Sequence, residues 1–194
     1  MKLEEVGKLS IGATLARIKA KPNEKAYLRR LFTIQELNKV TVDPYLQVEG
    51  QEILVSDRYI QEVPIAKVGM VLIGLTAPRA FVVTEAYEGY VIPINFAYLE
   101  CHEGVCPEYV AWYFNEHPAI QRRLVVERQG SSLQALSVQK IKELPLELPH
   151  VSIQEKIARV YRLRRQRQQL SVEKQRLEEK LLNQLMIQYL KEEQ

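Results

Sequence analysis

Two cysteines and a histidine stand close together in the segment Cys101-His102-Glu103-Gly104-Val105-Cys106. Thiolates and imidazoles are common zinc ligands, but a structural zinc site needs four ligands. The chain has 2 cysteines, and no second ligand pair lies near them in the sequence. We therefore interpret Cys101 and Cys106 as reduced, partly buried thiols and predict no metal site.

No other pattern of residues indicates catalysis. The aspartates, Asp43 and Asp57, belong to no carboxylate and lysine arrangement of the kind that metal-dependent nucleases use. No glycine-rich fingerprint follows a predicted strand, as a nucleotide or S-adenosylmethionine pocket would require. No nucleophile shares a motif with His102, His117 or His150. We predict a binding protein that is not an enzyme, without catalytic residues or a cofactor site of its own.

Length and composition indicate one domain of ordinary size with an extension. The chain has 194 residues, of which 46% are hydrophobic and 26% are charged. No apolar run is long enough to span a bilayer, and the first residues lack a signal-peptide pattern. We therefore expect a soluble, cytoplasmic protein without membrane contact.

The charge is distributed unevenly along the chain. Residues 1–150 hold 17 Lys and Arg against 18 Asp and Glu, whereas residues 151–194 hold 10 against 6. Composition alone does not indicate DNA binding. If residues 1–150 bind DNA, they must gather their cations on one face, because their net charge is not positive.

Short β-prone runs fill the first half of the chain. Alternating apolar and polar residues predict a strand from Tyr27 to Leu37. Further short apolar runs are separated by glycine, proline and charged residues: 53–55, 63–65, 71–73, 80–83 and 90–99. We predict a β-rich core within an α/β (α+β) domain.

A helical region follows this core. Pro107 opens a predicted helix that runs to Glu116, and a second helical segment covers residues 119–126. The first helix carries Tyr109, Trp112 and Tyr113 on one stripe, and an aromatic stripe at helical spacing is usually part of a core. We interpret this stripe as core and not as a surface for base stacking.

The stretch from Gln129 to Ile157 organises the rest of the chain. It begins with a small polar loop, residues 129–132, and Ser137 is placed to cap a short helix that should stop near Leu144-Pro145. Two prolines then bracket an extended segment, residues 146–148. The order Ser152-Ile153-Gln154-Glu155 fits a capping box, which predicts that a new helix starts at Ser152.

This last helix should be long, because no glycine or proline interrupts the sequence from Ser152 to about Glu193. At 1.5 Å per residue it would be about 60 Å long. Apolar residues recur at a spacing of about seven, and such a stripe must be buried against a partner. The predicted interface residues are Val160, Leu163, Leu170, Leu177, Leu181, Leu185 and Tyr189.

Cations on the predicted helix affect how it could pair and what else it could contact. Arg167 and Lys174 occupy seam positions, where they weaken a tight parallel zipper and favour a partner surface or an antiparallel pair. A run of arginines, comprising Arg159, Arg162, Arg164, Arg165 and Arg167, is interpreted as a solvated face, with contact to a DNA backbone as the alternative.

The order of residues between the polar loop and the long helix resembles the end of a recognition domain in the specificity (S) subunit of type I restriction–modification systems. The matching residues are Gly130, Ser131, Leu136, Ser137, Ile141, Leu148, Pro149, Gln154 and Ile157. In that family a Gly-Asp pair commonly opens a central strand, and here the corresponding place reads Gly69-Met70-Val71-Leu72, without the aspartate. Family members usually carry two recognition domains and two helices, whereas this chain has room for one of each.

The resemblance implies that the domain reads double-stranded DNA. Arginine, glutamine and serine carry the donors that contact base edges and phosphates. On that basis the expected DNA-facing residues are Arg79, in the turn from Thr76, and Gln129, Ser131, Ser132 and Gln134, in the polar loop. The alternative is that the loop only makes a turn and supports the helix start at Ser137.

Our principal hypothesis is a half-length type I specificity subunit. Residues 1–150 would be the DNA-binding recognition domain, and residues 151–194 would form a coiled-coil helix for homodimerisation and methyltransferase docking. The resemblance implies methyltransferase (M) subunits as partners, with S-adenosylmethionine bound on them, and a restriction (R) subunit where the system has one. Two alternatives stay open: a protein–protein adaptor with a dimerising helix and no DNA role, and the detached recognition module of a fused restriction–methylation enzyme.

Overall fold

The computed structural model describes residues 1–129 and 135–192. These residues form two compact units, Met1–Ala158 and Arg159–Gln194. The strands are β1 (Gly7–Ile11), β2 (Ala26–Arg30), β3 (Glu52–Ser56), β4 (Val71–Gly74), β5 (Ala80–Val82) and β6 (Phe96–Cys101). The α-helices are α1 (Leu15–Ile18), α2 (Ile34–Thr41), α3 (Pro107–Glu116), α4 (Pro118–Gln129), α5 (Val138–Lys142) and α6 (Val151–Glu192), and two 3-10 turns cover Leu3–Glu5 and Glu85–Tyr87.

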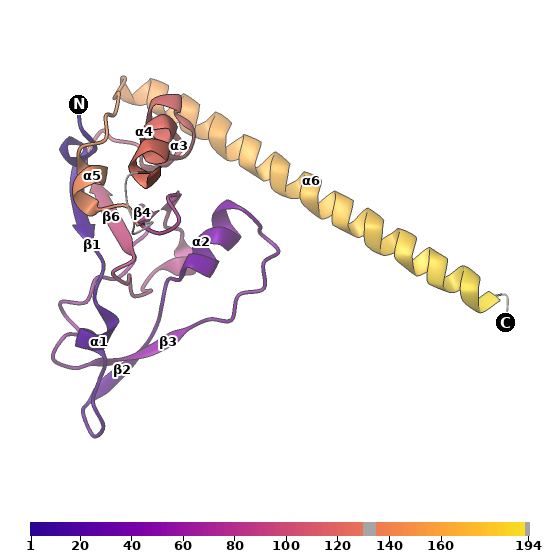
Figure 1. Ribbon diagram of the computed structural model, residues 1–194, viewed down its shortest axis with the longest axis horizontal. Coiled ribbons are helices and arrows are strands. Elements are labelled where there is room, and N and C mark those ends of the chain that lie inside the picture. The colour runs from indigo at the N-terminus through magenta and orange to yellow at the C-terminus, as the bar shows by residue number, and fades with distance from the viewer. Residues whose placement is uncertain (130–134, 193–194) are drawn as a thin grey trace. The chain divides into compact units, whose positions relative to one another are not determined.

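An antiparallel sheet with the strand order β1-β6-β4-β5 forms the centre of the first unit (Figure 1). Strand β4 lies in its interior, and all four of its residues are buried. Val71 and Ile73 pack into a cluster with α3, α4 and α5, whereas Leu72 packs on the opposite face with Phe32 and Phe96. Both faces of the sheet are therefore covered, which explains why β4 reads as an unbroken apolar run.

The resemblance placed a central strand at Gly69-Met70-Val71-Leu72, and the structure has β4 there. Gly69 has a φ of +86°, a left-handed conformation that glycine adopts without steric cost. This glycine turns the chain into the central strand. The predicted α/β fold with a β-rich core is confirmed.

The aromatic stripe of α3 is part of the core, as predicted. Tyr109 and Tyr113 are buried and Trp112 is half-buried. The Tyr109 hydroxyl donates to the carbonyl oxygen of Glu147 at 2.5 Å, and burial raises the pKa of Tyr109 to about 12. Helix α4 extends to Gln129, three residues beyond the predicted segment, so Gln129 ends a helix and does not open a loop.

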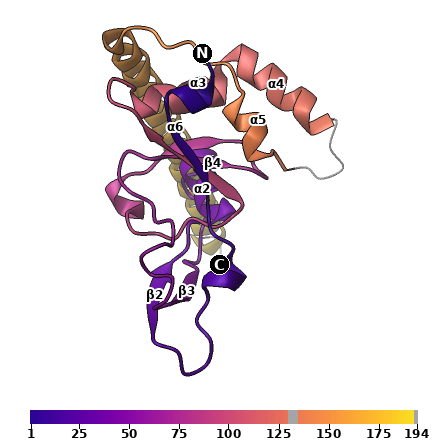
Figure 2. The same cartoon turned by 90° about the vertical axis from the view of Figure 1, so that its left-hand side faces the viewer.

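The second sheet is a two-stranded ribbon of β2 and β3. It packs with α1 on a separate apolar cluster that contains Ile18, Ile53 and Val55. In both views of the molecule the ribbon lies at one end of the first unit, and α3, α4 and α5 lie at the other (Figures 1 and 2). The unit is therefore built in two parts.

Three sequence predictions for strands need correction. The strand predicted from Tyr27 to Leu37 is wrong beyond Arg30, because Thr33 and Glu36 form a reciprocal capping box that starts α2 at Ile34. Residues 63–65 form no named strand, although Ile65 makes an isolated bridge to Val91. In the run 90–99 the regular strand begins at Phe96, since Pro93 interrupts the residues before it.

Helix α6 is a single helix of 42 residues, as the uninterrupted sequence predicted. Its start differs from the expected capping box at Ser152. The helix begins at Val151, and the imidazole Nδ1 of His150 accepts from the Ser152 N–H at 3.4 Å. The carbonyl oxygen of His150 accepts from the N–H groups of Ile153 and Gln154, so His150 is the capping residue.

The boundary between the two units lies within α6. The first turns of α6 belong to the unit Met1–Ala158, and the remainder of the helix forms the other unit. The assignment of DNA binding to residues 1–150 and of assembly to residues 151–194 stays a prediction. Among the described residues, no helix has the length and apolar composition needed to cross a membrane.

Candidate nucleic-acid interface

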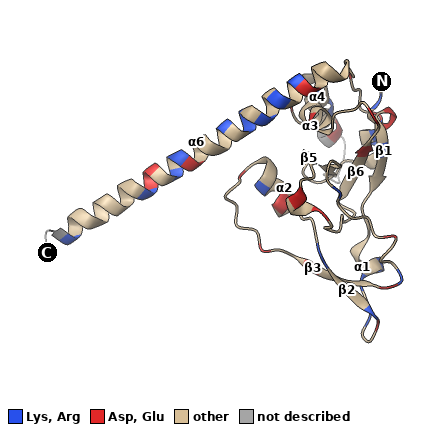
Figure 3. Cartoon of the chain, turned by 180° about the vertical axis from the view of Figure 1, so that it is seen from behind, with Lys and Arg blue, Asp and Glu red and all other residues tan. Residues whose placement is uncertain are grey.

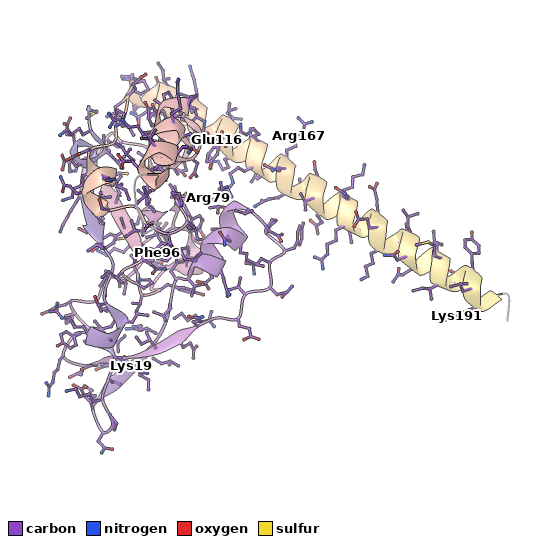
Figure 4. All side chains as sticks on the ribbon, in the orientation of Figure 1. Lys19, Arg79, Phe96, Glu116, Arg167 and Lys191 are labelled. Atoms are coloured by element: carbon purple, nitrogen blue, oxygen red, sulfur yellow. The ribbon has the colours of Figure 1, made fainter. Side chains whose placement is uncertain are left out.

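The turn between β4 and β5 presents Arg79 at the surface. The turn closes through hydrogen bonds from the Gly74 N–H to the Arg79 carbonyl oxygen, at 3.0 Å, and from the Arg79 N–H to the Ala77 carbonyl oxygen, at 2.7 Å. A Cβ on Gly74 would lie 2.4 Å from that Ala77 oxygen, so the close approach requires glycine. The Arg79 side chain is exposed and is labelled in Figure 4.

Helix α3 holds this turn in place through Asn115. The Asn115 side chain accepts from the Ala80 N–H at 2.7 Å and donates to the Ala80 carbonyl oxygen at 2.8 Å. An amide side chain that satisfies both polar groups of one backbone residue fixes the position of that residue. Arg79 is the neighbour of Ala80, so its backbone is fixed as well.

A surface pocket of about 350 Å³ adjoins the turn. Its lining combines the turn with residues of α3 and α4: Thr76, Ala77, Pro78, Arg79, Asn115, Gln121, Leu124 and Val125. Gln121 donates to the Phe114 carbonyl oxygen at 2.8 Å, which joins the start of α4 to α3. The pocket therefore has walls that hydrogen bonds tie together, an apolar side from α4 and, among the described residues that line it, one cation, Arg79.

The segments that flank the predicted polar loop lie at the same place. Gln129 is one helical turn beyond Val125 of the pocket wall, and on the other side the Leu136 N–H donates to the Leu75 carbonyl oxygen at 2.8 Å. Ser131, Ser132 and Gln134 lie outside the described residues. Two segments that are distant in sequence, the Arg79 turn and the flanks of the loop, thus meet beside one pocket.

The segment after the loop is anchored as expected. Ser137 accepts from the Lys140 N–H and caps α5, which confirms the predicted helix start. The ammonium group of Lys140 pairs with the Glu127 carboxylate of α4. Sequence patterns did not indicate Asn115, Gln121 or this pair, because their roles depend on contacts between elements and not on spacing along the chain.

The thiols of Cys101 and Cys106 are suited to packing and not to reaction or metal binding. Both are free, half-buried thiols. Burial raises the pKa of Cys101 to about 12 and is the largest cause of the raised pKa of Cys106. Thiols with raised pKa values are poor nucleophiles and poor metal ligands at neutral pH. Among the described residues, no cluster of three or more His, Cys, Asp or Glu side chains could hold a metal ion.

Gln154, one of the residues that carry the family resemblance, connects the first turn of α6 to the globular unit. Its side chain is buried, and its Oε1 accepts from the Cys106 N–H at 2.9 Å. Its Nε2 donates to the carbonyl oxygens of Gly104, at 3.2 Å, and Pro149, at 2.8 Å. One side chain therefore satisfies three backbone groups from two loops.

The predicted interface residues of α6 form an exposed stripe. Leu163, Leu170 and Leu177 are each more than half exposed. Val160, Leu181, Leu185 and Tyr189 are exposed too, and so are several further apolar residues near the end of the helix: Leu182, Met186, Ile187 and Leu190. A run of exposed apolar side chains this long is unusual in a monomeric protein.

Comparisons with solved structures show that the fold is a known one. A chain from a study of complex assembly and conformational transition of the type I R-M system superposes with a TM-score of 0.60 at 16% identity, over 88% of this chain and 43% of that chain. The HsdS subunit from Thermoanaerobacter tengcongensis superposes with a TM-score of 0.52 at 15% identity, over 88% of this chain and 38% of that one.

The chain thus spans about two-fifths of the length of either structure it matches. The matched 88% is more than the unit Met1–Ala158 contains, so the likeness extends into the helix beyond Ala158. No protein-family model and no curated protein matches the sequence. The resemblance inferred from residues 130–157 is confirmed as a likeness of fold to a type I specificity subunit.

Proposed function

We propose that the protein is a half-length specificity subunit of a type I restriction–modification system. In this role it binds DNA sequence-specifically and positions methyltransferase and restriction subunits without catalysing a reaction itself. The observation that carries the proposal is the fold match, which covers 88% of the chain and therefore extends beyond Ala158 into the long helix. The independent match of Ser137, Gln154 and their neighbours to the family pattern supports it.

The DNA-facing surface in this proposal is the pocket at the β4–β5 turn. Arg79 supplies a guanidinium beside these walls, and Gln129, Ser131, Ser132 and Gln134 belong to the segment whose flanks reach the same pocket. Arginine, glutamine and serine donors suit both base edges and phosphates. Asn115 has a positioning role, because it holds the turn and not the DNA.

In this proposal helix α6 provides the surface through which the subunits assemble. We propose that the stripe from Val160 to Tyr189 pairs with the same stripe of a second copy, with the two helices antiparallel. Methyltransferase subunits, which bind S-adenosylmethionine, would dock on this pair. A stripe of this size is buried in a standard interface, and Arg167 and Lys174 at the seam disfavour the parallel alternative.

Symmetry then determines the kind of target. Two identical recognition domains related by a two-fold axis bind identical half-sites in inverted orientation, so the preferred DNA is a palindrome interrupted by an unread spacer. Sequencing the DNA sites that are methylated or bound by the protein with its methyltransferase tests this. A continuous or non-palindromic site would contradict the symmetric half-length subunit.

The second candidate function is a protein–protein adaptor without a DNA role. The exposed stripe on α6 and the absence of net positive charge in residues 1–150 favour it. Binding to duplex DNA, measured at several salt concentrations with and without a methyltransferase, separates the two candidates. Salt-dependent binding supports the specificity subunit, and no binding in either condition supports the adaptor.

A further inference from the structure

The cations of the globular unit are not spread evenly over it. Residues 1–158 contain 18 Lys and Arg against 19 Asp and Glu. Two short segments, residues 17–30 and 52–58, hold 7 of these cations and 3 of the acids. The rest of the unit therefore carries 11 cations against 16 acids. A unit with almost no net charge thus contains, in these two segments, a region in which cations outnumber acids by four.

The fold brings these two segments together, and we call them the basic lobe. Strand β2 pairs with β3 over their whole length, from Ala26 opposite Ser56 to Arg30 opposite Glu52. The end of α1 joins the other edge of β3, where the Ala20 N–H donates to the Leu54 carbonyl oxygen at 2.9 Å. Figure 3 shows Lys and Arg along α1, the following loop and β2.

The loop at the tip of the basic lobe is a defined turn. The Glu24 N–H donates to the Lys21 carbonyl oxygen at 3.1 Å, and Asn23 has a φ of +66° after Pro22, as in a type II turn. The Glu24 carboxylate accepts from the Lys21 N–H at 3.0 Å, and this hydrogen bond is the largest cause of the lowered pKa of Glu24. The turn therefore holds its cations on an ordered backbone.

Several cations of the basic lobe remain available to a ligand. In the described part of the chain, Lys19 and Arg29 make no ion pair, and both are exposed. The cations of the pairs Lys25–Asp57, at 3.3 Å, and Arg58–Glu24, at 3.1 Å, have exposed side chains, and surface ion pairs contribute little stability. None of these side chains has a structural role that would prevent contact with an anion.

We propose that the basic lobe contacts the phosphate backbone of duplex DNA. This surface is separate from the pocket at Arg79. Phosphate contacts supply affinity and register, whereas base contacts supply sequence preference, and the two are often made by different elements. Lys19, in the basic lobe, and Arg79 lie in different parts of the unit in Figure 4. The inference rests on the proposed DNA-binding function and gives the backbone contact its own surface.

An exposed apolar pair on the same ribbon is the main argument for a different partner. Leu28 and Leu54 lie directly opposite each other across β2 and β3, and both are more than half exposed. Such a pair also suits a protein surface. Charge favours DNA, because the basic lobe holds 7 cations against 3 acids, whereas the remainder of the unit, counted together, holds more acids than cations. The protein alternative is an outcome of the test.

The test measures affinity of the full-length chain for a mixed-sequence duplex as salt is varied, for the wild type and for Lys19→Ala combined with Arg29→Ala. Each lost phosphate contact reduces the slope of log K against log salt by about 0.9, so the double variant should lose about 1.8 from the slope and bind roughly tenfold more weakly near physiological salt. The matched control is Lys8→Ala combined with Lys142→Ala, which removes the same charge from β1 and α5.

The outcomes separate the inference from the function on which it rests. A full wild-type slope in the Lys19/Arg29 variant, or an equal loss in the Lys8/Lys142 control, overturns the basic lobe while leaving DNA binding in place. A changed half-site preference in the Lys19/Arg29 variant would show that the basic lobe reads bases. That result overturns its role in contacting the backbone. Loss of methyltransferase binding with unchanged DNA binding makes the ribbon a protein surface. A wild-type chain that binds no duplex, alone or with methyltransferase, overturns the proposed function itself.

Discussion

The globular unit and the helix beyond Ala158 place their apolar side chains in opposite ways. In the first unit Phe32 and Phe96 have no exposed surface, and the apolar clusters of the sheets are closed by helices and loops of the same chain. Along α6, in contrast, Leu170 and Leu177 are 65% and 58% exposed. Burial drives folding, so the first unit should be stable alone, whereas the helix should gain stability from the proposed partner.

The polar contacts of the helix support this difference. Lys174 pairs with Glu178 at 3.6 Å, and Gln175 donates to Glu179 at 3.2 Å, each at a spacing of four residues. Pairs of this kind contribute only about 0.3–0.5 kcal/mol each. They favour a helical conformation, but they cannot replace the burial of a long apolar stripe. Local propensity alone therefore does not account for the stability of a helix of this length.

The largest effect should come from placing charge in that stripe. Leu170→Glu combined with Leu177→Glu removes two leucines per chain that the proposed dimer buries, each worth about 1.5–3 kcal/mol, and leaves carboxylates against an apolar partner. Self-association should weaken at least about a hundredfold, as measured by sedimentation. A chain that lacks residues 160–194 should be a folded monomer.

The control for this prediction changes the charge equally on another face. Gln168→Glu combined with Gln175→Glu adds the same two carboxylates away from the leucines. It removes the Gln175–Glu179 hydrogen bond, a pair of the kind worth about 0.3–0.5 kcal/mol, and should therefore weaken association by no more than a few-fold. An intact chain that sediments as a monomer at tens of micromolar, where standard interfaces associate, would contradict the proposed dimer.

A smaller effect is expected where α6 meets the globular fold through Gln154. Gln154→Ala leaves the Cys106 N–H and the carbonyl oxygens of Gly104 and Pro149 without their partner, and buried unsatisfied groups cost about 1–3 kcal/mol each when water cannot reach them. We expect the free energy of unfolding to fall by about 2–4 kcal/mol in denaturant titrations. Gln139→Ala, at an exposed position of α5, should change it by less than about 0.5 kcal/mol. Equal losses in both variants would remove Gln154 from its connecting role.

Sequence patterns predicted the parts of the fold that local residues determine. The uninterrupted run before Glu192 gave α6, Ser137 gave the start of α5, and the apolar residues 71–73 gave the central strand. The prediction failed where two local signals competed. Alternation continued past Arg30 towards Leu37, but the Thr33–Glu36 capping box starts a helix within it. Capping outweighs alternation there because two hydrogen bonds satisfy the free N–H groups of the first turn.

Less of the candidate site than of the fold could be predicted from the sequence. Arg79 could be chosen because an arginine in a Pro-containing turn is exposed and carries donors. Asn115, the wall from α4 and the meeting of Leu75 with Leu136 arise from contacts between distant segments, which no spacing encodes. The basic lobe was likewise hidden, since residues 17–30 and 52–58 become one positive region only when β2 and β3 pair.

Variants of Arg79 and Asn115 at the pocket should distinguish a residue that contacts DNA from one that only positions the turn. Arg79→Ala should lower DNA affinity about tenfold with unchanged thermal stability, because the side chain is exposed. Asn115→Ala should lower stability by about 1–2 kcal/mol, since the Ala80 backbone loses two hydrogen bonds, and should lower affinity only through the displaced turn. Gln134→Ala should resemble Arg79→Ala. Unchanged affinity for Arg79→Ala and Gln134→Ala at matched salt would remove both from the site.

The smallest effect concerns His150, the residue that caps the start of α6. The sequence favoured Ser152 as the cap, whereas in the structure His150 accepts from the Ser152 N–H and from the next two N–H groups through its carbonyl. His150→Ala should therefore cost about 0.5–1 kcal/mol, the usual loss when a capping side chain is removed. Ser152→Ala keeps the N–H donor and loses only the hydroxyl contact to the imidazole, so it should cost less. Thermal unfolding of both variants decides the order, and a larger loss for Ser152→Ala would restore the capping box that the sequence predicted.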